Sequence, residues 1–540
     1  MGPIVFAAAL AAYTVTAAPA VGWLDSAEFV AAAQTLGISH PPGQPLAALL
    51  GRAVAYLPIG DIAFRVNLAS AIAGAAAAAM LYRLVARLRG PVVGAAAALA
   101  FAFAAAAWEQ SIRAEVYALT AALLLFALDE ALRGRALAAA LATGLALTVH
   151  PYIGLAFAVP AAAYVLAGRP GVAAGGRLAA AGLLGLCAFL YLPLRAGTAV
   201  DWGDPNRVDR FWWTVSARAF QKSLGQPEPL AVRAGDVATA LTRGLTLVGA
   251  GLALVGAYVL VRRRETRAAG LLLVGVAAAG AAGRALVGFD FDNPDALGYL
   301  LPALAALVAL AAAAVPRALA PLAFALAFWH LAHPVSLRGA YAAEGYGRAV
   351  LDPLPPRTLL LTSFNETTFI LWSLAGERPD VTIVDRNFLT HPFAADVVKR
   401  RHPELAALLD APLRGGAPTP VAALPARPIA FELAMDFAPD DPAVARLAPH
   451  GPVAHYGALP DEAADARAAA DLLRLLDTPA PIDRHGAARA LAWNAYLTAR
   501  FYCMVGRRDA ARAADARARS LADRDDAMLA ELERACGLGP

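Results

Sequence analysis

The chain has 540 residues, of which 59% are hydrophobic and 16% charged, and its mean hydropathy is +0.54. Average soluble domains carry roughly 25% charged residues, so this composition indicates a membrane protein. The formal net charge is only +4, and lysine occurs only at Lys222 and Lys399. We therefore exclude a nucleic-acid-binding protein, because such a protein concentrates basic residues on one surface.

The N-terminal part of the chain, residues 1–334, contains repeated apolar runs that are nearly free of charge. A helix needs roughly 17–25 such residues to cross a lipid bilayer. We predict a mainly α-helical, polytopic domain with about eleven spans. The predicted spans are residues 4–22, 66–86, 91–107, 116–132, 136–149, 152–168, 178–194, 237–261, 268–288, 297–315 and 318–333.

Charges in the connections between these runs predict the orientation of the chain. With a cytoplasmic N-terminus every inside connection is basic, as the positive-inside rule requires. These arginines are Arg83, Arg87, Arg89, Arg133, Arg135, Arg169, Arg177, Arg262 to Arg264, Arg267 and Arg317. The outside connections are then residues 23–65, 108–115, 150–151, 195–236 and 289–296. A cleaved signal peptide is the alternative interpretation of residues 1–20, and it leaves the remaining topology unchanged.

From about residue 335 the sequence becomes proline-rich, charged and mixed, and with eleven spans it lies outside the cytoplasm. An apolar run at 357–363, a helical pattern at 366–375 and a second run at 381–385 predict strand, helix and strand. We therefore expect an extracytoplasmic α/β domain over residues 335–460.

Residues 461–540 are predicted to form a helical tail. Apolar and charged residues alternate at helical spacing over 462–476 and 486–534, with Gly506 between two helices, which is typical of a single tetratricopeptide-type hairpin. Cys503 and Cys536 form a disulfide if the tail is extracytoplasmic and their helices are adjacent; the alternative is two free thiols. Cys187 lies in an apolar run and is expected to pack as a small hydrophobic residue.

Two carboxylates mark the first outside connection, in the sequence WLDSAEF at residues 23–29. Asp25 and Glu28 are three residues apart and share one face if this segment is helical. One interpretation makes them catalytic acids just beyond the first span. The other makes Asp25 a helix N-cap with Glu28 three residues later, which is a capping pair without chemistry.

The sequence GISHPPGQPL and the segment up to residue 67 are too proline-rich for one helix and too amphipathic for a plain loop. We expect this stretch to lie along the membrane surface. His40 is a candidate substrate-binding residue because imidazole titrates or donates a hydrogen bond near neutral pH. The alternative is a histidine that caps a turn before Pro41.

Two further outside connections carry candidate substrate-binding residues. Glu109 and Arg113 lie between two spans, where the alternatives are an interfacial anchor and an ion pair. Arg195 closes a span at headgroup depth, where a guanidinium suits bidentate phosphate binding or snorkels to the membrane surface. Trp202 and Asp204 follow in the sequence DWGDP, and an aromatic belt at the membrane interface is the alternative for the tryptophan.

Four segments together resemble the bacterial protein O-mannosyltransferase-like family. They are WLDSAEFVAAAQTLGISHPPGQPL, GDIAFRVNLAS, YLPLRAGTAVDWGDPNRVDRFWW and RTLLLTSFNETTFILWSLAGERPDVTIVD. The resemblance covers roughly residues 10–390 and implies a GT-C-type membrane glycosyltransferase. It implies a polyprenyl-phosphate-linked sugar as donor, an exported protein or glycan as acceptor, and an active site on the extracytoplasmic face of the inner membrane.

Carried over residue by residue, the family's first-loop acid is Asp25, with Glu28 beside it, and its HPPG motif starts at His40. Two departures stand out. Gln44 replaces an aromatic residue, and the segment with Glu366 reads SFNETTF where a GDNDTF-like sequence is usual in the family.

We expect Asp25 to act as general base in a single inverting displacement, with Glu28 orienting it or binding sugar hydroxyls, and Arg195 steadying the leaving phosphate. Neither a metal nor another cofactor is expected. The expected partners are the lipid-linked sugar, the acceptor and the lipid bilayer, without nucleic acid. The competing classes are a transporter or lipid flippase and a non-catalytic assembly scaffold of the cell envelope.

Overall fold

The computed structural model describes residues 1–224, 228–288, 293–391, 393–410, 418–433 and 441–521, together with residues 530, 532, 534, 536 and 537. The predicted outside connection 289–296 and the end of the predicted helical stretch 486–534 therefore lie partly outside the described residues. The chain divides into two compact units. The helical unit comprises Met1–Ala17, His40–Leu194 and Trp212–Ser336, and the tail unit comprises Ala18–Ser39, Arg195–Phe211 and Leu337–Pro540.

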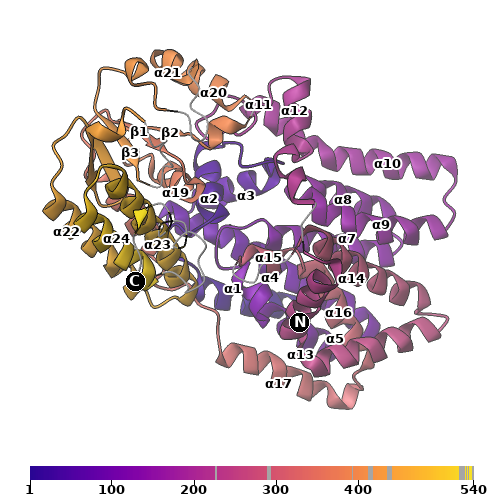
Figure 1. Cartoon of the computed structure of the whole chain (residues 1–540). Coiled ribbons are helices and arrows are strands. Elements are labelled where there is room, and N and C mark those ends of the chain that lie inside the picture. Colours follow the sequence, from indigo (N-terminus) through magenta and orange to yellow (C-terminus); the bar gives the residue numbers. More distant parts are fainter. Residues whose placement is uncertain are drawn as a thin grey trace. The chain divides into compact units, whose positions relative to one another are not determined.

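Long apolar helices form the helical unit, and each of the eleven predicted apolar runs overlaps one of them (Figure 1). The helices are α1 (Gly2–Thr16), α4 (Ile62–Arg89), α5 (Pro91–Phe103), α7 (Tyr117–Leu132), α8 (Ala136–Val149), α9 (Pro151–Ala167), α10 (Val172–Leu186), α13 (Leu230–Arg262), α14 (Arg267–Val287), α16 (Leu301–Ala314) and α17 (Ala320–Ala332).

Length and composition qualify four stretches of the described residues to cross a membrane, namely α4, Val172–Arg195, α13 and α14. The other apolar helices of the unit are shorter, with 10–17 residues. The helical architecture is therefore as predicted, while the number of eleven spans stays a prediction.

Small residues allow close helix packing within this unit. A Cβ atom on Gly185 of α10 would lie 2.6 Å from the carbonyl oxygen of Leu141 on α8. Only a glycine permits this approach, which brings two backbones together as small residues do in membrane helix pairs. The glycine therefore holds α10 against α8.

An ion cluster joins α4 and α7 at one end of these helices. The buried Asp129 carboxylate forms ion pairs with Arg83 at 2.9 Å and Arg133 at 3.0 Å, and also with Arg87. Glu130 pairs with Arg83 at 3.0 Å. Several of the arginines that mark the predicted cytoplasmic turns thus neutralise two buried acids, so they also have a structural role.

A five-stranded sheet forms the centre of the tail unit, with strand order β2-β1-β3-β5-β4. The strands are β1 (Leu359–Thr362), β2 (Thr382–Asp385), β3 (Ile429–Glu432), β4 (Leu447–His450) and β5 (Val453–Tyr456). Strand β1 is parallel to both β2 and β3, whereas β5 is antiparallel to β3 and β4. Helix α19 (Asn365–Leu374) connects β1 to β2, which confirms the predicted order of strand, helix and strand.

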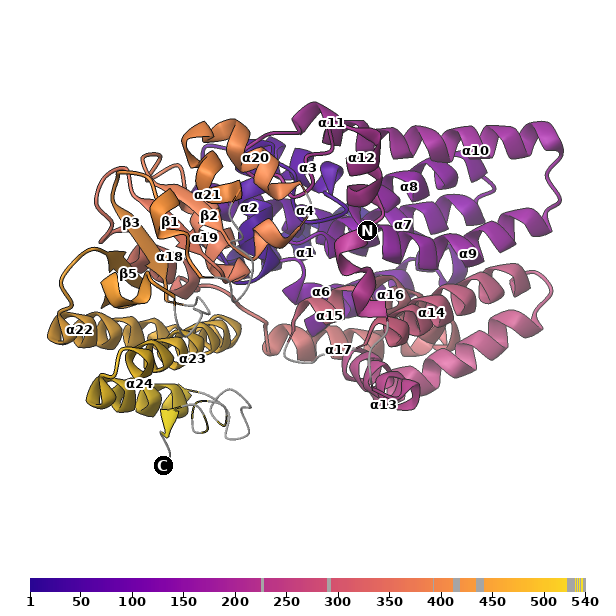
Figure 2. The ribbon, with the colours of Figure 1, turned by 45° about the horizontal axis from the view of Figure 1, so that its top comes forward.

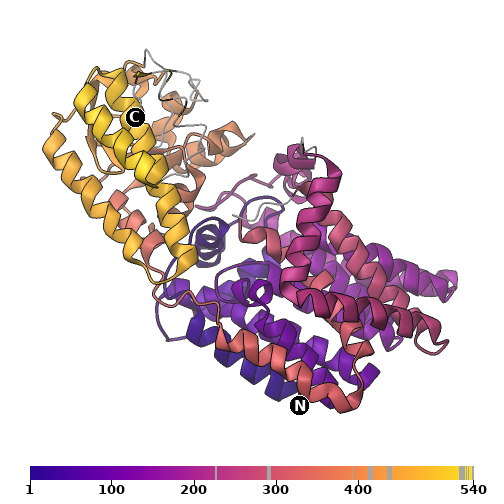
Figure 3. The same cartoon turned by 60° about the horizontal axis from the view of Figure 1, so that its bottom comes forward.

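Helices α22 (Glu462–Leu472), α23 (Pro481–Met504) and α24 (Arg508–Leu521) follow the sheet in sequence (Figure 2). Gly506 has a φ of 74° in the turn between α23 and α24, a conformation that glycine adopts without steric cost. The two helices run side by side in Figure 3, where they are yellow. The predicted helical hairpin with Gly506 at its turn is thus confirmed.

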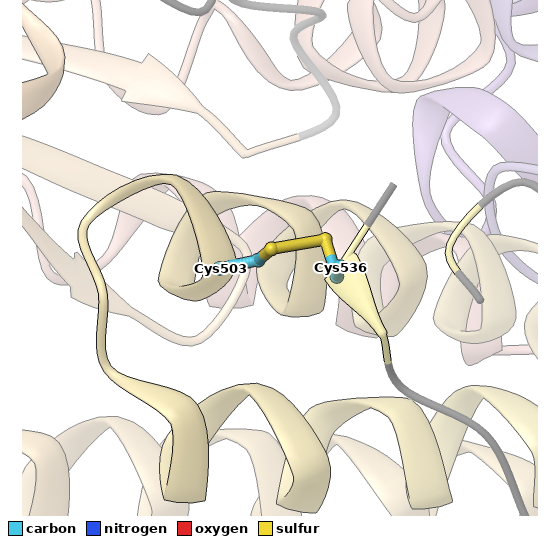
Figure 4. The surroundings of a disulfide bond; sticks show 2 residues. All are labelled: Cys503 and Cys536. Atoms are coloured by element: carbon cyan, nitrogen blue, oxygen red, sulfur yellow. A yellow bond between two sulfur atoms is a disulfide. The ribbon is translucent and has the colours of Figure 1, made fainter. Parts of the chain in front are cut away.

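A disulfide bond links Cys503 of α23 to Cys536, with a distance of 5.9 Å between their Cα atoms (Figure 4). The first of the two predicted alternatives for these cysteines is therefore confirmed. Cys187 is a free, exposed cysteine, and its packing as a small hydrophobic residue stays a prediction. Its thiol lies on the outer surface of the apolar segment that contains it.

The compact units are divided differently from the three predicted domains, residues 1–334, 335–460 and 461–540, which stay a prediction. Two segments that precede residue 334, Ala18–Ser39 and Arg195–Phe211, belong to the tail unit. The first of them contains Asp25 and Glu28, and the second contains Arg195, Trp202 and Asp204. Five of the predicted site residues therefore lie on the unit that contains the sheet.

Candidate functional site

Helix α2 (Asp25–Thr35) carries the two acids of the first predicted outside connection. Asp25 is its first residue and is partly buried, and Glu28 is fully buried. A carboxylate oxygen of Asp25 lies within 4.8 Å of one of Glu28. Negative charge is favoured at this end of a helix because the unpaired backbone N–H groups point there. The predicted pair thus shares one helix turn.

The capping alternative for these acids does not describe the structure. Leu24 holds the N-cap position with a φ of 57°, and no side-chain capping hydrogen bond is present there. Asp25 therefore lies inside the helix instead of before it. A simple capping box, with Asp25 as the cap, would place Glu28 one position earlier in the helix.

Helix α2 packs against α19 within the tail unit. Ala31 and Ala32 of α2 form a buried apolar cluster with Val200, and the ring of Trp372 on α19 packs against it. Small side chains on α2 allow this close approach. The helix that carries Asp25 is therefore held by residues from the middle and the C-terminal part of the chain.

Arg195 anchors the other end of α2. Its Nε donates to the carbonyl oxygen of Leu36 at 2.7 Å, and its Nη2 donates to that of Thr35 at 3.0 Å. A cation at a helix C-terminus satisfies the last carbonyl groups and complements the helix dipole. These bonds give Arg195 a structural role, and its predicted phosphate contact gains no support from them.

The backbone after α2 pairs with the DWGDP segment. Ile38 donates its N–H to Val200 at 2.7 Å and forms a parallel bridge with Asp201. A Cβ atom on Gly37 would lie 2.6 Å from the Val200 carbonyl oxygen, so this approach requires a glycine. The two segments that were predicted to lie outside are thus one structural element.

Asp201 organises the turn that contains Trp202. Its carboxylate accepts hydrogen bonds from the N–H groups of Gly197 at 2.6 Å, Gly203 at 3.2 Å and Asp204 at 2.8 Å. Burial raises the pKa of Asp201 to about 6, although these hydrogen bonds oppose the shift. Its role is therefore to hold the loop, as aspartate does in Asx-turns.

Trp202 is a core residue, with 3% of its surface exposed. Its ring lies 4.9 Å from that of Phe388, 5.0 Å from that of His391 and 6.0 Å from that of Phe369, measured between ring centroids. The predicted substrate contact and the aromatic-belt alternative both need an accessible ring. The structure instead makes Trp202 the apolar anchor of its loop.

Asp204 is completely buried and neutralised by two arginines. Arg400 contacts both of its oxygens, at 2.5 Å and 2.8 Å, and Arg210 forms a second ion pair. Arg210 in turn donates to Asp396 at 2.6 Å. The DWGDP segment is thereby joined to α20 (Ala394–Arg401), which makes Asp204 a positioning residue.

His40 belongs to the helical unit. Its Nε2 lies 3.1 Å from Nε2 of Gln44, and its ring makes an edge contact with Phe220 at 5.6 Å. Gln44, which replaces an aromatic residue of the family, thus has a defined role because it holds the imidazole. This fixed ring is compatible with either predicted role of His40.

Glu109 and Arg113 belong to a buried ion cluster of the helical unit. Arg113 Nη1 lies 3.1 Å from Glu115, and its Nη2 lies 2.6 Å from Asp295. Although burial works against its charge, Asp295, Glu115 and Glu109 raise the pKa of Arg113. Gln110 extends the cluster by donating to the carbonyl oxygen of Pro294 at 2.8 Å. The ion-pair alternative therefore describes Arg113.

Glu109 differs from the other acids of this cluster. Burial raises its pKa to about 7, with Arg113 lowering it and Asp295 raising it. A carboxyl group with such a pKa is a candidate acid or base at neutral pH. Because only 8% of its surface is exposed, Glu109 can act as an acid or base only toward groups that reach the cluster itself.

A second polar cluster of the helical unit was missed by the sequence analysis. Arg284 of α14 is 8% exposed, and its guanidinium lies 4.7 Å from the centre of the Tyr299 ring. The His150 ring lies 4.7 Å from Tyr299 and 5.6 Å from Tyr117. Tyr152 donates to the Gly283 carbonyl oxygen at 2.5 Å. An arginine and several ring systems thus converge near the start of α9 and the end of α14.

His150 in this cluster is neutral at physiological pH. Burial lowers its pKa to about 3, and the charges of His40 and Arg284 act in the same direction. Its Nδ1 accepts a hydrogen bond from the N–H of Ile153 at 3.4 Å, so its Nε2 carries the proton. His150 can therefore donate one hydrogen bond while Arg284 supplies the positive charge.

Glu366, the acid of the SFNETTF segment, pairs with Arg489 of α23 at 2.6 Å. Another acid lies nearby at the end of β3. Glu432 is fully buried and accepts from the N–H groups of Ser363 at 3.0 Å and Phe364 at 3.2 Å. These contacts link β1, β3 and α23, and they give the segment a structural role in the tail unit.

Residues 25–170 match the family model described as the protein O-mannosyl-transferase TMEM260 N-terminal domain. The chain is similar to the protein O-mannosyl-transferase TMEM260 of Mus musculus, with 42% identity over 117 residues. The match covers 21% of this chain and 17% of the mouse protein.

Two solved structures share the fold over most of the chain. They are those of ArnT from Cupriavidus metallidurans, in the apo state and bound to undecaprenyl phosphate. The apo structure matches with a TM-score of 0.58, and the match covers 84% of this chain and 97% of ArnT. The structure with undecaprenyl phosphate matches with a TM-score of 0.54, and the match covers 79% of this chain and 92% of ArnT. The sequence identity is 15% in both. The predicted resemblance to the protein O-mannosyltransferase-like family is therefore confirmed, and the protein is a multi-pass membrane protein with a GT-C fold.

Proposed function

We propose that the protein is a glycosyltransferase that moves a sugar, mannose or another hexose, from a polyprenyl-phosphate donor to a hydroxyl group of an exported protein or glycan. The position of Asp25 and Glu28 carries this proposal. The two acids open the segment that matches the O-mannosyl-transferase model, and they share the first turn of α2. The donor class is supported by the fold shared with ArnT, one structure of which contains undecaprenyl phosphate.

Asp25 is the proposed general base. Its carboxylate accepts the proton of the acceptor hydroxyl while that oxygen attacks the anomeric carbon of the sugar. The bond between the anomeric carbon and the phosphate oxygen breaks, and polyprenyl phosphate leaves with the electron pair. One displacement inverts the anomeric configuration. Glu28, fully buried three residues further along α2, orients Asp25.

Arg284 is the proposed ligand of the lipid phosphate, in place of Arg195. Arg195 uses two of its nitrogens for the end of α2, whereas Arg284 lines a small cavity with Tyr152 and Tyr299. A guanidinium in a site with little water stabilises the charge that develops on a leaving phosphate. His150 Nε2–H and His40 are the proposed neighbouring hydrogen-bonding groups for the donor.

The remaining predicted site residues are proposed to position the catalytic and donor-binding residues. Trp202 and Asp204 hold the segment against which α2 packs, and Arg195 fixes the end of α2. Arg113 and Glu109 hold the cluster at the start of α7. Each of these side chains acts on the reaction through another residue.

The proposed location is the inner membrane, with the tail unit on the extracytoplasmic face. The disulfide between Cys503 and Cys536 supports this orientation, because disulfide bonds persist in oxidising compartments. The arginine distribution of the connections agrees with the same orientation.

A donor panel tests the proposed function. The purified full chain in lipid nanodiscs is incubated with an acceptor extract and with polyprenyl phosphate that carries radiolabelled mannose, glucose or another hexose. Transfer of label from at least one donor to protein or glycan is expected. Absence of transfer with every donor in the presence of this acceptor extract would contradict the proposal and favour a transporter or a scaffold.

A further inference from the structure

The parallel part of the tail sheet has a switch point between β1 and β3. Helix α19 leads from β1 to β2 on one side, and the next connection returns to β3 on the other side of β1 (Figure 1). In open α/β sheets, ligands bind outside the carboxyl ends of the strands at such a point. Here these ends are Thr362 of β1 and Glu432 of β3, so this edge of the sheet is a candidate binding site.

Phosphate does not fit this switch point. An anion would bind through the backbone N–H groups at the start of the following helix. The completely buried carboxylate of Glu432 already accepts hydrogen bonds from the N–H groups of Ser363 and Phe364, at 3.0 Å and 3.2 Å. Glu366 adds a second acid in the first turn of α19. A neutral ligand is therefore favoured over an anionic one.

Four side chains from the start of α19 and from α23 gather beside these strand ends. The rings of Phe364 and Trp493 lie 6.2 Å apart between centroids, at an interplanar angle of 32°. Arg489 precedes Trp493 by one helix turn, and its Nη2 donates to both oxygens of Glu366, at 2.6 Å and 2.7 Å. All four residues are partly exposed. The tail unit thus presents two aromatic rings next to a guanidinium and a carboxylate.

Two hydrogen-bond donors of this group are buried and unpaired. The Nε–H of Arg489 and the indole N–H of Trp493 have no hydrogen-bond partner among the described residues. Buried polar groups are normally hydrogen-bonded, so such an exception requires an explanation. The two residues are four positions apart and therefore lie on one face of α23. A ligand that brings oxygen atoms to this face would satisfy both donors.

We propose that Phe364, Glu366, Arg489 and Trp493 form a binding site for a hexopyranose, which we call the sugar subsite. The C–H face of a pyranose packs against the negative face of an aromatic ring. Its hydroxyl groups donate to a carboxylate and accept from a guanidinium or an indole N–H. A peptide that binds to a sheet instead pairs with an exposed edge strand, whereas β1 and β3 are interior strands of the sheet.

The sugar subsite lies in the same unit as Asp25 and close to the residues before it. A Cβ atom on Gly486 of α23 would lie 2.4 Å from Cδ1 of Trp23, so this turn of α23 lies directly against the indole. Arg489 follows Gly486 by three residues and is its neighbour on the helix surface. The subsite is thus placed to hold the sugar of an acceptor glycan or of the lipid-linked donor, and only this origin of the sugar rests on the proposed function.

Saturation-transfer NMR on the purified full chain in lipid nanodiscs tests the sugar subsite without sugar transfer. The ligands are the methyl α-glycosides of mannose, glucose and galactose. The variants are E366Q/R489Q, which keeps the pair neutral, W493F, which keeps a ring without the indole N–H, and W493A. The controls are D471N/R474Q, an exposed ion pair of the same unit, and W329A, which removes a tryptophan of α17 that is 63% exposed.

We expect at least one glycoside to bind to wild type and to both controls. Its dissociation constant should rise by roughly ten-fold or more in E366Q/R489Q and in W493A, because bonds to charged groups and ring contacts contribute on this scale. The rise should be smaller in W493F. Absence of binding of every glycoside to wild type would overturn the proposal, as would unchanged dissociation constants in E366Q/R489Q and W493A.

Competition experiments distinguish the origins of the sugar. If a short-chain prenyl phosphate that carries the bound sugar displaces the glycoside at a lower concentration than a trisaccharide of that sugar, the subsite holds the donor sugar. The reverse order supports an acceptor glycan. Displacement by inorganic phosphate, or by a sugar-free peptide rich in serine and threonine, would overturn the proposal. Glycoside binding without transfer from any donor would support the subsite and contradict only the proposed function.

Discussion

Trp23 donates its indole N–H to the carboxylate of Asp483 at 2.8 Å, although 460 residues separate them in sequence. The same carboxylate accepts from the N–H of Ala342 at 3.0 Å and from the hydroxyl of Thr478 at 2.8 Å. Trp23 also lies against Tyr346, with 5.9 Å between ring centroids. The residue two positions before Asp25 is therefore fixed by the C-terminal helices.

Trp23→Phe is predicted to lower the turnover of the transferase while leaving the donor KM nearly unchanged. The variant keeps an aromatic ring and removes only the hydrogen-bond donor, which is worth about 1 kcal/mol. We expect a several-fold loss of kcat from a displaced Asp25, measured with the radiolabelled donor. Asp471→Asn, which changes an exposed acid of α22, serves as control. A wild-type kcat in Trp23→Phe would mean that this bond does not position the loop.

Arg195→Gln and Arg284→Gln are predicted to affect different kinetic constants. Loss of the Arg195 hydrogen bonds loosens the end of α2, so we expect a lower kcat and an unchanged donor KM. Loss of Arg284 removes a charged contact to phosphate, worth about 1.5–3 kcal/mol, so the donor KM rises by about ten-fold or more. The exposed Arg207→Gln is the control. If the donor KM rises in Arg195→Gln and not in Arg284→Gln, Arg195 and not Arg284 binds the phosphate.

The raised pKa of Glu432 predicts that the stability of the tail unit depends on pH. Burial raises its pKa to about 7, from an ordinary value of 4.5, so between these values the folded state binds more protons than the unfolded state. The free energy of unfolding therefore falls as pH rises from about 4.5 to 7, by up to about 3 kcal/mol. Burial also raises the pKa of Asp385, which acts in the same direction.

Thermal unfolding of the purified chain measures this effect through tryptophan fluorescence. We expect a lower Tm at pH 8 than at pH 5.5 in wild type and a smaller difference in Glu432→Gln, whose side chain has the same shape without the titration. Glu404→Gln, which alters an acid that is 49% exposed, is the control. Equal pH dependence in wild type and Glu432→Gln would contradict the assignment.

Reduction of the disulfide is predicted to destabilise the helical hairpin. Cys503 and Cys536 are 33 residues apart, and closing a loop of this length is worth about 3–4 kcal/mol in the chain-entropy model. Alkylation of the unfolded, unreduced protein followed by mass spectrometry should modify Cys187 only. Modification of all three cysteines in protein isolated from membranes would contradict the disulfide and its oxidising compartment.

Local patterns predicted most of the elements. The apolar runs 357–363 and 381–385 with a helical pattern between them became β1, α19 and β2, because strand and helix periodicity is a property of neighbouring residues. The eleven apolar runs overlap helices for the same reason. Gly506 marked the hairpin turn through its backbone freedom.

Contacts between distant segments could not be predicted from the sequence. Arg195 bonds to Thr35 and Leu36, which are about 160 residues away, and no local pattern indicates such a partner. Arg195 therefore looked like a phosphate ligand, and Trp202 like an exposed aromatic residue. Arg284 did give a signal, because an ionisable residue inside an apolar run is a functional candidate in itself. The high hydropathy of residues 268–288 concealed it.

Comparison of Asp25→Asn with wild type tests the central claim most directly. Asparagine keeps the size of the side chain and cannot accept the acceptor proton, so sugar transfer from the active donor should fall by about 10²–10⁴-fold. Asp209→Asn, an exposed acid in the same unit, should transfer at the wild-type rate. If Asp25→Asn, at matched expression and unchanged Tm, transfers sugar as fast as wild type, Asp25 is not the catalytic base and the proposed mechanism is wrong.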